Sequence, residues 1–449
     1  MTQIKMAVQA SAFSSVDPEQ VRCMHGAIFC VDDAGMIDSV LLPGEPGFDR
    51  RREELLREGK LRVLPESQVL LPGFVDLHIH APQWPQAGTA LDRPLEVWLG
   101  EYTFPLEAKY RDPEFAARVY EDVVTTTLSH GTTTAMYFAT VDRQPSVTLA
   151  KICGRLGQRG LVGKVVMDDP VSNPDFCRDE SPAAAVRETE AFIREVQEIQ
   201  NDYPQKVYPV ITPRFIPSCT DESLEGLGKL VQKYGVHVQT HCSESDWEHG
   251  FVRERHGMND AQSLDRFGLL TSRTVLAHAT FLSDEDVALL ARKKTSIAHS
   301  PISNAYFASS VLPLHDFSRG GVNIGLATDV SGGYSPSMYQ AIRQAVISSR
   351  MLQEGVDPRR SYDDRGRKHA AIPLNRAFYA ATAAGGAALE LPIGRLEAGY
   401  AFDAQVIDLS RGIPHYYPEK KEEDLFHKIL LLCESSNVSE VWVQGRRVK

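Results

Sequence analysis

Eight short apolar runs, each followed by a polar or amphipathic stretch, restrict the fold of this chain more than any other feature. Four segments with helical periodicity stand out among the stretches between the runs: 113–129, 183–200, 221–234 and 284–293. Alternating strands and helices predict a parallel sheet with right-handed crossovers, and eight such units are typical of a closed (β/α)8, or TIM, barrel of the α/β class. The runs are 69–80, 132–139, 161–167, 207–215, 236–241, 274–278, 296–299 and 323–329.

An open, doubly wound sheet is the competing fold, but the first run lacks the glycine-rich phosphate turn that such sheets often carry. The two ends of the chain lie outside the barrel and contain short β-like pieces. Because isolated short strands need partners, we expect both ends to pair into one small composite β-sandwich domain. The predicted domains are 1–70 and 393–449 for the two parts of the sandwich and 71–392 for the barrel, with helical residues 376–389 closing it.

Charge and composition exclude several classes of partner. The chain has 449 residues, 24% of them charged, and a net charge of −11. It has no basic stripe, which argues against nucleic acid as a partner. No window approaches the roughly 18 consecutive apolar residues that a membrane span requires, and no secretory signal is evident. Seven scattered cysteines without a C-x-x-C pair indicate reduced thiols, so we expect a cytoplasmic protein.

Histidines and one aspartate mark the ends of several predicted strands. His78 and His80 are two residues apart at the end of the first run, so their side chains share one face of the strand. His241, His278 and Asp329 end the fifth, sixth and eighth runs. A hydrogen-bonded pair of core histidines would explain one such motif, but strand ends that converge at the mouth of a barrel favour a metal site. His299 ends the seventh run and is expected to shape the floor of the pocket as a hydrogen-bonded histidine. The remaining histidines, His415 among them, have no positional argument and are expected to be structural or exposed.

This constellation resembles the amidohydrolase superfamily, which has H-x-H on strand one, histidines on strands five and six and aspartate on strand eight. In members with two metal ions a lysine ends strand four, but the corresponding run here, I-T-P-R-F, has none. Lys164, on the third run, is expected to be structural. The resemblance therefore implies one divalent ion, and histidine nitrogens with a carboxylate favour zinc, one Zn²⁺ per subunit.

Longer stretches are similar to the guanine deaminases within that superfamily. This resemblance implies hydrolytic deamination of guanine to xanthine and ammonia, with water and guanine as the small-molecule reactants, in a homodimer. Trp84 departs from the tyrosine that is commoner in the family but keeps an aromatic face. The stretches are P-G-F-V-D-L-H-I-H-A-P-Q-W, G-T-T-T-A-M-Y-F-A-T, V-G-K-V-V-M-D, T-P-R-F-I-P-S-C, H-C-S-E, S-I-A-H-S-P-I-S-N and G-L-A-T-D-V-S-G-G-Y-S-P-S-M.

Zinc chemistry assigns roles to the predicted ligands and to one nearby glutamate. The predicted metal ligands are His78, His80, His241 and Asp329. A metal-held water has a pKa near 7, and Asp329 is placed to accept its proton. Glu244, in H-C-S-E, is the predicted proton shuttle to the purine ring; without that motif it would be interpreted as an exposed loop glutamate.

Other side chains are predicted to position the reactants. His278 is expected to hydrogen-bond the attacking oxygen without being a ligand itself, and with His241 and Asp329 it would also contact the substrate. By resemblance, the Gln83 amide matches the mixed donor and acceptor edge of a purine. Arg214 would donate to the oxygen at position 6 of guanine, and Phe215 would stack on the ring. The alternative for Arg214 is a surface salt bridge.

Two other functions stay open from the sequence. Within the fold, the chain could be another amidohydrolase: a deaminase of cytosine or adenosine-like substrates, or a chlorohydrolase or amidase acting on a triazine or related ring. The alternative of another class is a non-catalytic barrel that keeps its histidines and serves as a scaffold for a partner protein. The zinc deaminases that carry H-x-E with P-C-x-x-C are excluded, because the chain contains no such pair.

Overall fold

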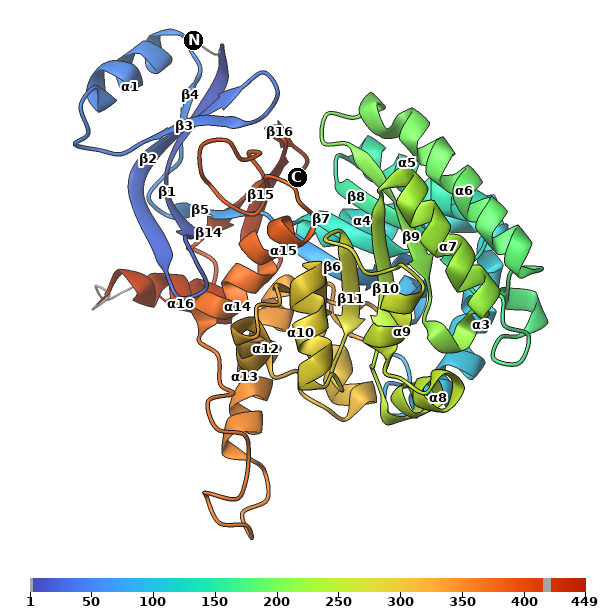
Figure 1. Cartoon of the computed structure of the whole chain (residues 1–449). Helices are drawn as coiled ribbons and strands as arrows, with labels where there is room; N and C mark the ends of the chain where they lie inside the picture. The colour runs from blue at the N-terminus through green and yellow to red at the C-terminus, as the bar shows by residue number, and fades with distance from the viewer. Residues whose placement is uncertain (1–2, 415–420) are drawn as a thin grey trace.

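The computed structural model describes residues 3–414 and 421–449, so His415 lies outside the described residues. Eight parallel strands follow one another in chain order around a barrel (Figure 1). The last strand returns to the first, where the Asp329 amide donates to the His78 carbonyl at 2.9 Å. The predicted (β/α)8 barrel is confirmed. Its strands are β6 (Phe74–His80), β7 (Thr132–Phe138), β8 (Arg159–Val166), β9 (Val207–Pro213), β10 (His237–Cys242), β11 (Thr274–His278), β12 (Ser296–His299) and β13 (Ile324–Leu326).

Helices cover the outside of the barrel, and local sequence signals set their ends. The N-cap Asp112 accepts from the amides of Glu114 and Phe115 at the start of α4 (Pro113–Ser129). Gly235, with a φ of 59°, ends α7 in the left-handed conformation that glycine favours. The other covering helices are α5 (Arg143–Leu156), α6 (Pro182–Ile199), α7 (Asp221–Tyr234), α8 (Asp246–His256), α9 (Asp260–Arg266), α10 (Asp284–Lys293), α13 (Met338–Glu354), α14 (Leu374–Ala381) and α15 (Ala383–Ala388).

The first predicted run, 69–80, is two strands and not one. Strand β5 (Gln68–Pro72) pairs with β1 and β14 in a separate sheet, and β6 begins the barrel. Gly73 separates them, and a Cβ atom there would lie 2.2 Å from Thr133 Oγ1. Only glycine therefore fits where the chain crosses between the two sheets. The continuous apolar pattern hid this crossing, because both strands are buried.

Both chain ends contribute to one mixed sheet beside the barrel, drawn in blue and red in Figure 1. Its strand order is β16-β15-β14-β5-β1-β2-β3, with β4 paired to β1. The predicted joining of the two ends is thus confirmed. The strands are β1 (Ile4–Ser15), β2 (Val21–Asp32), β3 (Ile37–Leu41), β4 (Leu61–Val63), β5, β14 (Ala404–Asp408), β15 (Val438–Val443) and β16 (Arg446–Arg447); α1 (Phe48–Arg57) and α16 (Glu422–Leu432) belong to the same two chain ends.

Two expectations about the chain as a whole can be compared with the structure. Among residues 3–414 and 421–449, no helix combines the length and apolar character needed to cross a bilayer. The seven cysteines form no disulfide with one another, and six of them are buried.

A buried ion pair joins the barrel to the mixed sheet. Arg159, at the start of β8, contacts the carboxylate of Asp403, and both side chains are almost completely buried. The other oxygen of Asp403 accepts from the Gln444 amide at 2.7 Å, and its carbonyl accepts from the Gly73 amide at 2.9 Å. Asp403 therefore fixes the point where the chain leaves one sheet and enters the other.

We predict that Asp403→Ala lowers the free energy of unfolding by about 3–5 kcal/mol, because it leaves the buried Arg159 charge without a carboxylate, with hydrogen bonds only to the neutral side chains of Thr134 and Gln444. Chemical denaturation followed by circular dichroism measures this change. The control is Asp363→Ala, which removes an exposed ion pair with Lys368 and should change stability little. Equal stability of the two variants would contradict the structural role assigned to Asp403.

Candidate active site

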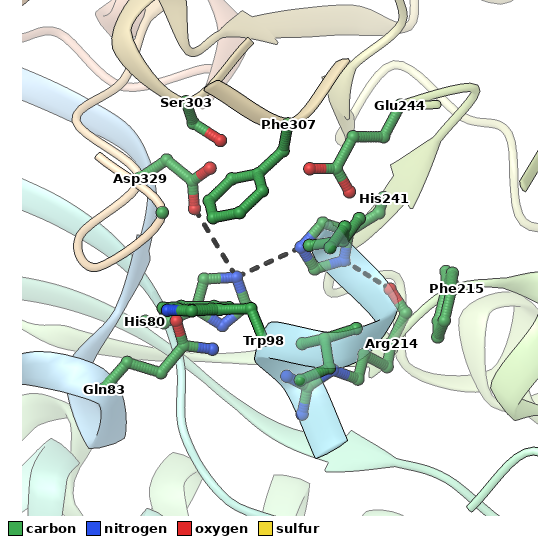
Figure 2. A pocket seen from close by; sticks show the side chains of 13 residues that line it. His80, Gln83, Trp98, Arg214, Phe215, His241, Glu244, Ser303, Phe307 and Asp329 are labelled. Atoms are coloured by element: carbon green, nitrogen blue, oxygen red, sulfur yellow. Dashed lines mark hydrogen bonds and ion pairs between the residues drawn. The ribbon is translucent and has the colours of Figure 1, made fainter. Parts of the chain in front are cut away.

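The carboxyl ends of the barrel strands surround a cavity that opens to solvent (Figure 2). Seven of the nine predicted site residues line it. The other two, His78 and His278, are 1% and 0% exposed and are not among the lining residues. The lining residues are His80, Gln83, Leu95, Trp98, Leu99, Arg214, Phe215, His241, Glu244, Ser303, Phe307, Asp329 and Gly332.

Four imidazoles and one carboxylate meet at these strand ends. His78 and His80 come from β6, His241 from β10 and His278 from β11, and Asp329 follows β13. The Nε2 atoms of His80 and His241 are 3.1 Å apart, and Asp329 Oδ1 lies 3.6 Å from His80 Nε2 (Figure 2). The same Asp329 oxygen lies 3.1 Å from His78 Nε2. Two groups of three residues have their possible ligand atoms within 4.8 Å of one another. One group is His78, His241 and His278, and the other is His78, His80 and Asp329.

Neighbouring oxygens fix which ring nitrogen of two histidines is free. His241 Nδ1 lies 2.6 Å from the Arg214 carbonyl, and His278 Nδ1 lies 2.8 Å from Asn304 Oδ1. Because a carbonyl oxygen only accepts, each Nδ1 carries the hydrogen and donates it. Each Nε2 then presents a lone pair toward the centre, as the second shell of a metal site requires.

Missing hydrogen bonds at two of the buried imidazole nitrogens indicate that the cluster fits a metal ion. Within the part of the chain that the structure describes, the buried Nε2 atoms of His78 and His278 make no hydrogen bond, although carboxylate oxygens of Asp329 and Glu244 lie 3.1 Å and 3.6 Å away from them, respectively. Burial, followed by the neighbouring imidazoles, lowers the pKa of His78, His80 and His241 well below the usual range. These imidazoles are therefore neutral. A cluster of neutral nitrogens with a carboxylate suits a divalent ion, not a hydrogen-bonded histidine core.

The backbone at these strand ends is held in an uncommon conformation. Ser243, His278 and Asp329 have positive φ values of 47°, 66° and 51°, each costing on the order of 1–3 kcal/mol for a residue other than glycine. Asp76 supports this region, because it accepts from the amides of His78 at 3.3 Å and Thr328 at 3.0 Å. It thereby ties β6 to the segment that carries Asp329.

Glu244 lies in the cavity wall and is not an exposed loop glutamate, since it is 7% exposed. Its Oε1 lies 3.6 Å from His278 Nε2, and its amide donates to Glu248 Oε2 at 2.7 Å. Burial first, and then the charge of Asp329, raises the pKa of Glu244 to about 8, while Arg214 lowers it. The carboxyl group therefore holds a proton at neutral pH and is able to donate it.

The alternative of a surface salt bridge for Arg214 is wrong, because Arg214 is 3% exposed and its partner is equally buried. The partner is Glu107 from α3 (Phe104–Glu107), with Nη1–Oε2 at 2.7 Å and Nη2–Oε1 at 3.2 Å. Gln83, which also lines the cavity, donates to Glu107 Oε1 at 3.3 Å. The sequence analysis missed Glu107, which lies in a short irregular helical segment without periodicity.

Aromatic and aliphatic side chains form the rest of the wall. Phe215 is 8% exposed and its ring centroid lies 6.3 Å from that of His241. Trp98 and Phe307, which the sequence analysis also missed, pack on each other with centroids 5.2 Å apart. Trp98 directly precedes the π-helical turn η2 (Leu99–Thr103), and Phe307 lies within a second one, η7 (Asn304–Ala308); this rare conformation is frequent at functional sites. The cavity is therefore lined largely by apolar and aromatic side chains, with a polar edge at Gln83 and Arg214.

Comparisons with known proteins agree with this site. The chain is 37% identical over 409 residues to a probable guanine deaminase of Schizosaccharomyces pombe, covering 89% of this chain and 75% of that protein. It is 37% identical over 407 residues to the guanine deaminase of Mus musculus, covering 88% and 86%. The crystal structure of guanine deaminase from C. acetobutylicum with bound guanine matches with a TM-score of 0.87 and 29% identity, over 98% of this chain and 99% of that one.

The model of the amidohydrolase family matches residues 69–448. This range includes all eight barrel strands and every residue of the histidine and aspartate cluster. Since the match covers most of the chain, the protein belongs to the amidohydrolase family.

Proposed function

We propose that this protein hydrolyses guanine to xanthine and ammonia. One observation carries the proposal: Glu244, Arg214 and Gln83 line the same cavity as His80 and His241. One small cavity is therefore lined by a proton donor, by polar side chains that suit the edge of a heterocycle, and by histidines that could bind a metal ion. The guanine deaminases that share most of this chain's length support the same substrate.

We assign His78, His80, His241 and Asp329 as the ligands of one zinc ion per subunit. Three imidazole nitrogens and a carboxylate are donors that zinc prefers. When bound, the ion supplies a water of lowered pKa and therefore a nucleophile at neutral pH. The Arg214 carbonyl orients the His241 ring for this role through the 2.6 Å bond to Nδ1.

The side chains around the cluster move two protons during the reaction. Asp329 accepts the proton of the attacking water, and His278 hydrogen-bonds the attacking oxygen through Nε2. As that oxygen bonds to carbon 2 of guanine, Glu244 delivers its proton to the adjacent ring nitrogen. Asp329 then passes the proton taken from water to the exocyclic nitrogen, and the bond from carbon 2 to that nitrogen breaks, so ammonia leaves. The hydroxyl on carbon 2 returns a proton to Glu244 and becomes the new carbonyl of xanthine, which restores both carboxyl groups.

The polar edge of the cavity selects the substrate. Arg214 donates to the oxygen at position 6, Gln83 pairs with the edge of the ring, and Phe215 packs against the ring face. Sites that hydrogen-bond a substrate group reject analogues without that group far better than apolar pockets do. This division of roles accounts for the position of Gln83 and Arg214 in one wall of the cavity.

The setting of the enzyme is also a proposal. Seven cysteines that form no disulfide with one another support a cytoplasmic location, and the resemblance to guanine deaminases supports a homodimer. For the domains we keep the sequence-predicted limits 1–70, 71–392 and 393–449, with the first limit moved to Gly73, where the chain passes from β5 to β6. Sedimentation analysis of the purified chain measures the oligomeric state directly.

The assay that tests the function incubates the purified protein with guanine, adenine, cytosine or adenosine and measures ammonia and the deaminated product. We expect xanthine from guanine and little turnover of the other three, since only guanine presents an oxygen at position 6 beside an amino group at position 2. Turnover of another substrate in place of guanine would favour a different amidohydrolase. No turnover by the metal-loaded protein would favour the scaffold hypothesis.

We predict that a chelator such as dipicolinate abolishes guanine turnover and that added zinc restores it. The fold should survive, because the barrel core packs independently of the cluster, so the far-ultraviolet circular dichroism spectrum is expected to stay unchanged. Elemental analysis before and after chelation quantifies the ion. Full activity in protein that has been shown to be metal-free would contradict the assignment.

We predict that Glu244→Gln lowers kcat by roughly 10²–10⁴-fold, because the amide cannot deliver a proton. Zinc content should equal that of the wild type, since Glu244 is not assigned as a ligand. The matched control is Glu254→Gln on the exposed side of α8, which should keep full activity. A Glu244→Gln enzyme with wild-type kcat would remove Glu244 from the mechanism.

A further inference from the structure

Glu107 connects the two polar side chains of the cavity without lining the cavity itself. One carboxylate oxygen, Oε2, accepts from Arg214 Nη1 at 2.7 Å. The other, Oε1, accepts from Arg214 Nη2 at 3.2 Å and from Gln83 Nε2 at 3.3 Å. With 2% exposure, Glu107 has no access to water that could replace these contacts.

The contact with Glu107 determines how Arg214 presents its donors. A carboxylate that binds two guanidinium nitrogens at once fixes the plane of that group. The Arg214 guanidinium also lies 5.2 Å from the centroid of the Phe104 ring, from the same helix as Glu107. Only the remaining N–H groups of Arg214 are free to reach a ligand, and their direction is set by Glu107 and Phe104.

The same carboxylate determines the orientation of the Gln83 amide. Gln83 Nε2 donates to Glu107 Oε1, and Gln83 Oε1 accepts from the Ser331 amide at 3.4 Å. A flipped amide would place its oxygen against a carboxylate and its NH₂ against a backbone N–H. Gln83 therefore offers a ligand one N–H and one oxygen lone pair, in a fixed order.

We propose that Glu107 is the positioning residue that sets substrate specificity, by fixing the hydrogen-bonding pattern that Arg214 and Gln83 present to the purine edge. This inference rests on the proposed function and names the group that enforces its selectivity. With donors fixed at this wall, a ring with an oxygen at position 6 is accepted. A ring with an amino group there, as in 2,6-diaminopurine, places donor against donor and is rejected.

The test compares Glu107→Gln with the wild type on guanine and on 2,6-diaminopurine. The glutamine side chain has nearly the same shape but replaces one acceptor with a donor, so it cannot satisfy both Arg214 and Gln83. We expect KM for guanine to rise roughly tenfold or more, while kcat changes much less, and the ratio of kcat/KM for the two purines to fall at least about tenfold.

Asp403→Asn is the matched control, because it also removes a buried carboxylate from an arginine but lies at the junction with the mixed sheet. It should lower the melting temperature and leave the purine ratio unchanged. If Glu107→Gln fails to fold, Glu107→Asp takes its place, since the shorter carboxylate keeps the charge but cannot reach both partners. It is expected to show the same fall in the ratio.

Wild-type turnover in the same assay separates the two claims. A wild-type enzyme that does not deaminate guanine overturns the proposed function itself. A wild type that does, together with a folded, zinc-loaded Glu107 variant of unchanged KM and unchanged purine ratio, overturns the role of Glu107 alone.

Discussion

The structure depends on the close approach of buried, neutral imidazoles at the mouth of the barrel. His80 and His241 bring two Nε2 atoms to 3.1 Å, and Nε2 of His78 and His278 has no hydrogen-bond partner among the described residues. Burying polar atoms without a hydrogen bond is costly, and a cation bound by the Nε2 lone pairs of His241 and His278 and by their neighbours would remove that cost. The barrel makes this arrangement possible, because strands far apart in sequence end at the same mouth.

Buried ionisable side chains also determine the properties of the cavity wall. The Arg214 side chain forms an ion pair with Glu107, and its carbonyl accepts a hydrogen bond from His241. One residue therefore belongs both to the polar edge of the cavity and to the surroundings of the histidine cluster. Glu244 has no arginine or lysine partner at hydrogen-bond distance in the described part of the chain, and its raised pKa keeps it protonated. One side of the cavity is thus prepared to bind an oxygen and the other to donate a proton.

Much of the fold can be predicted from the sequence, because signals within each segment set where the helices begin and end. The helices at 113–129, 221–234 and 284–293 have the bounds that their patterns predict, because Asp112, Thr220 and Ser283 cap them within the sequence itself. The five cluster residues are predictable because strand ends converge in a barrel. The division of residues 69–80 into two strands at Gly73 could not be predicted. Both strands are buried, so the apolar pattern continues unbroken where the chain passes from one sheet to the other. Glu107, Trp98 and Phe307 were missed because they belong to irregular helical turns, and their partners are distant in the chain.

The most direct test of the account is a crystal structure of the protein with data collected on both sides of the zinc absorption edge. The account predicts one anomalous peak per chain, within about 2.0–2.2 Å of nitrogens from His78, His80 and His241 and of an Asp329 oxygen. It would be contradicted if the cluster held no peak in zinc-containing protein, or if these side chains pointed away from a peak located elsewhere.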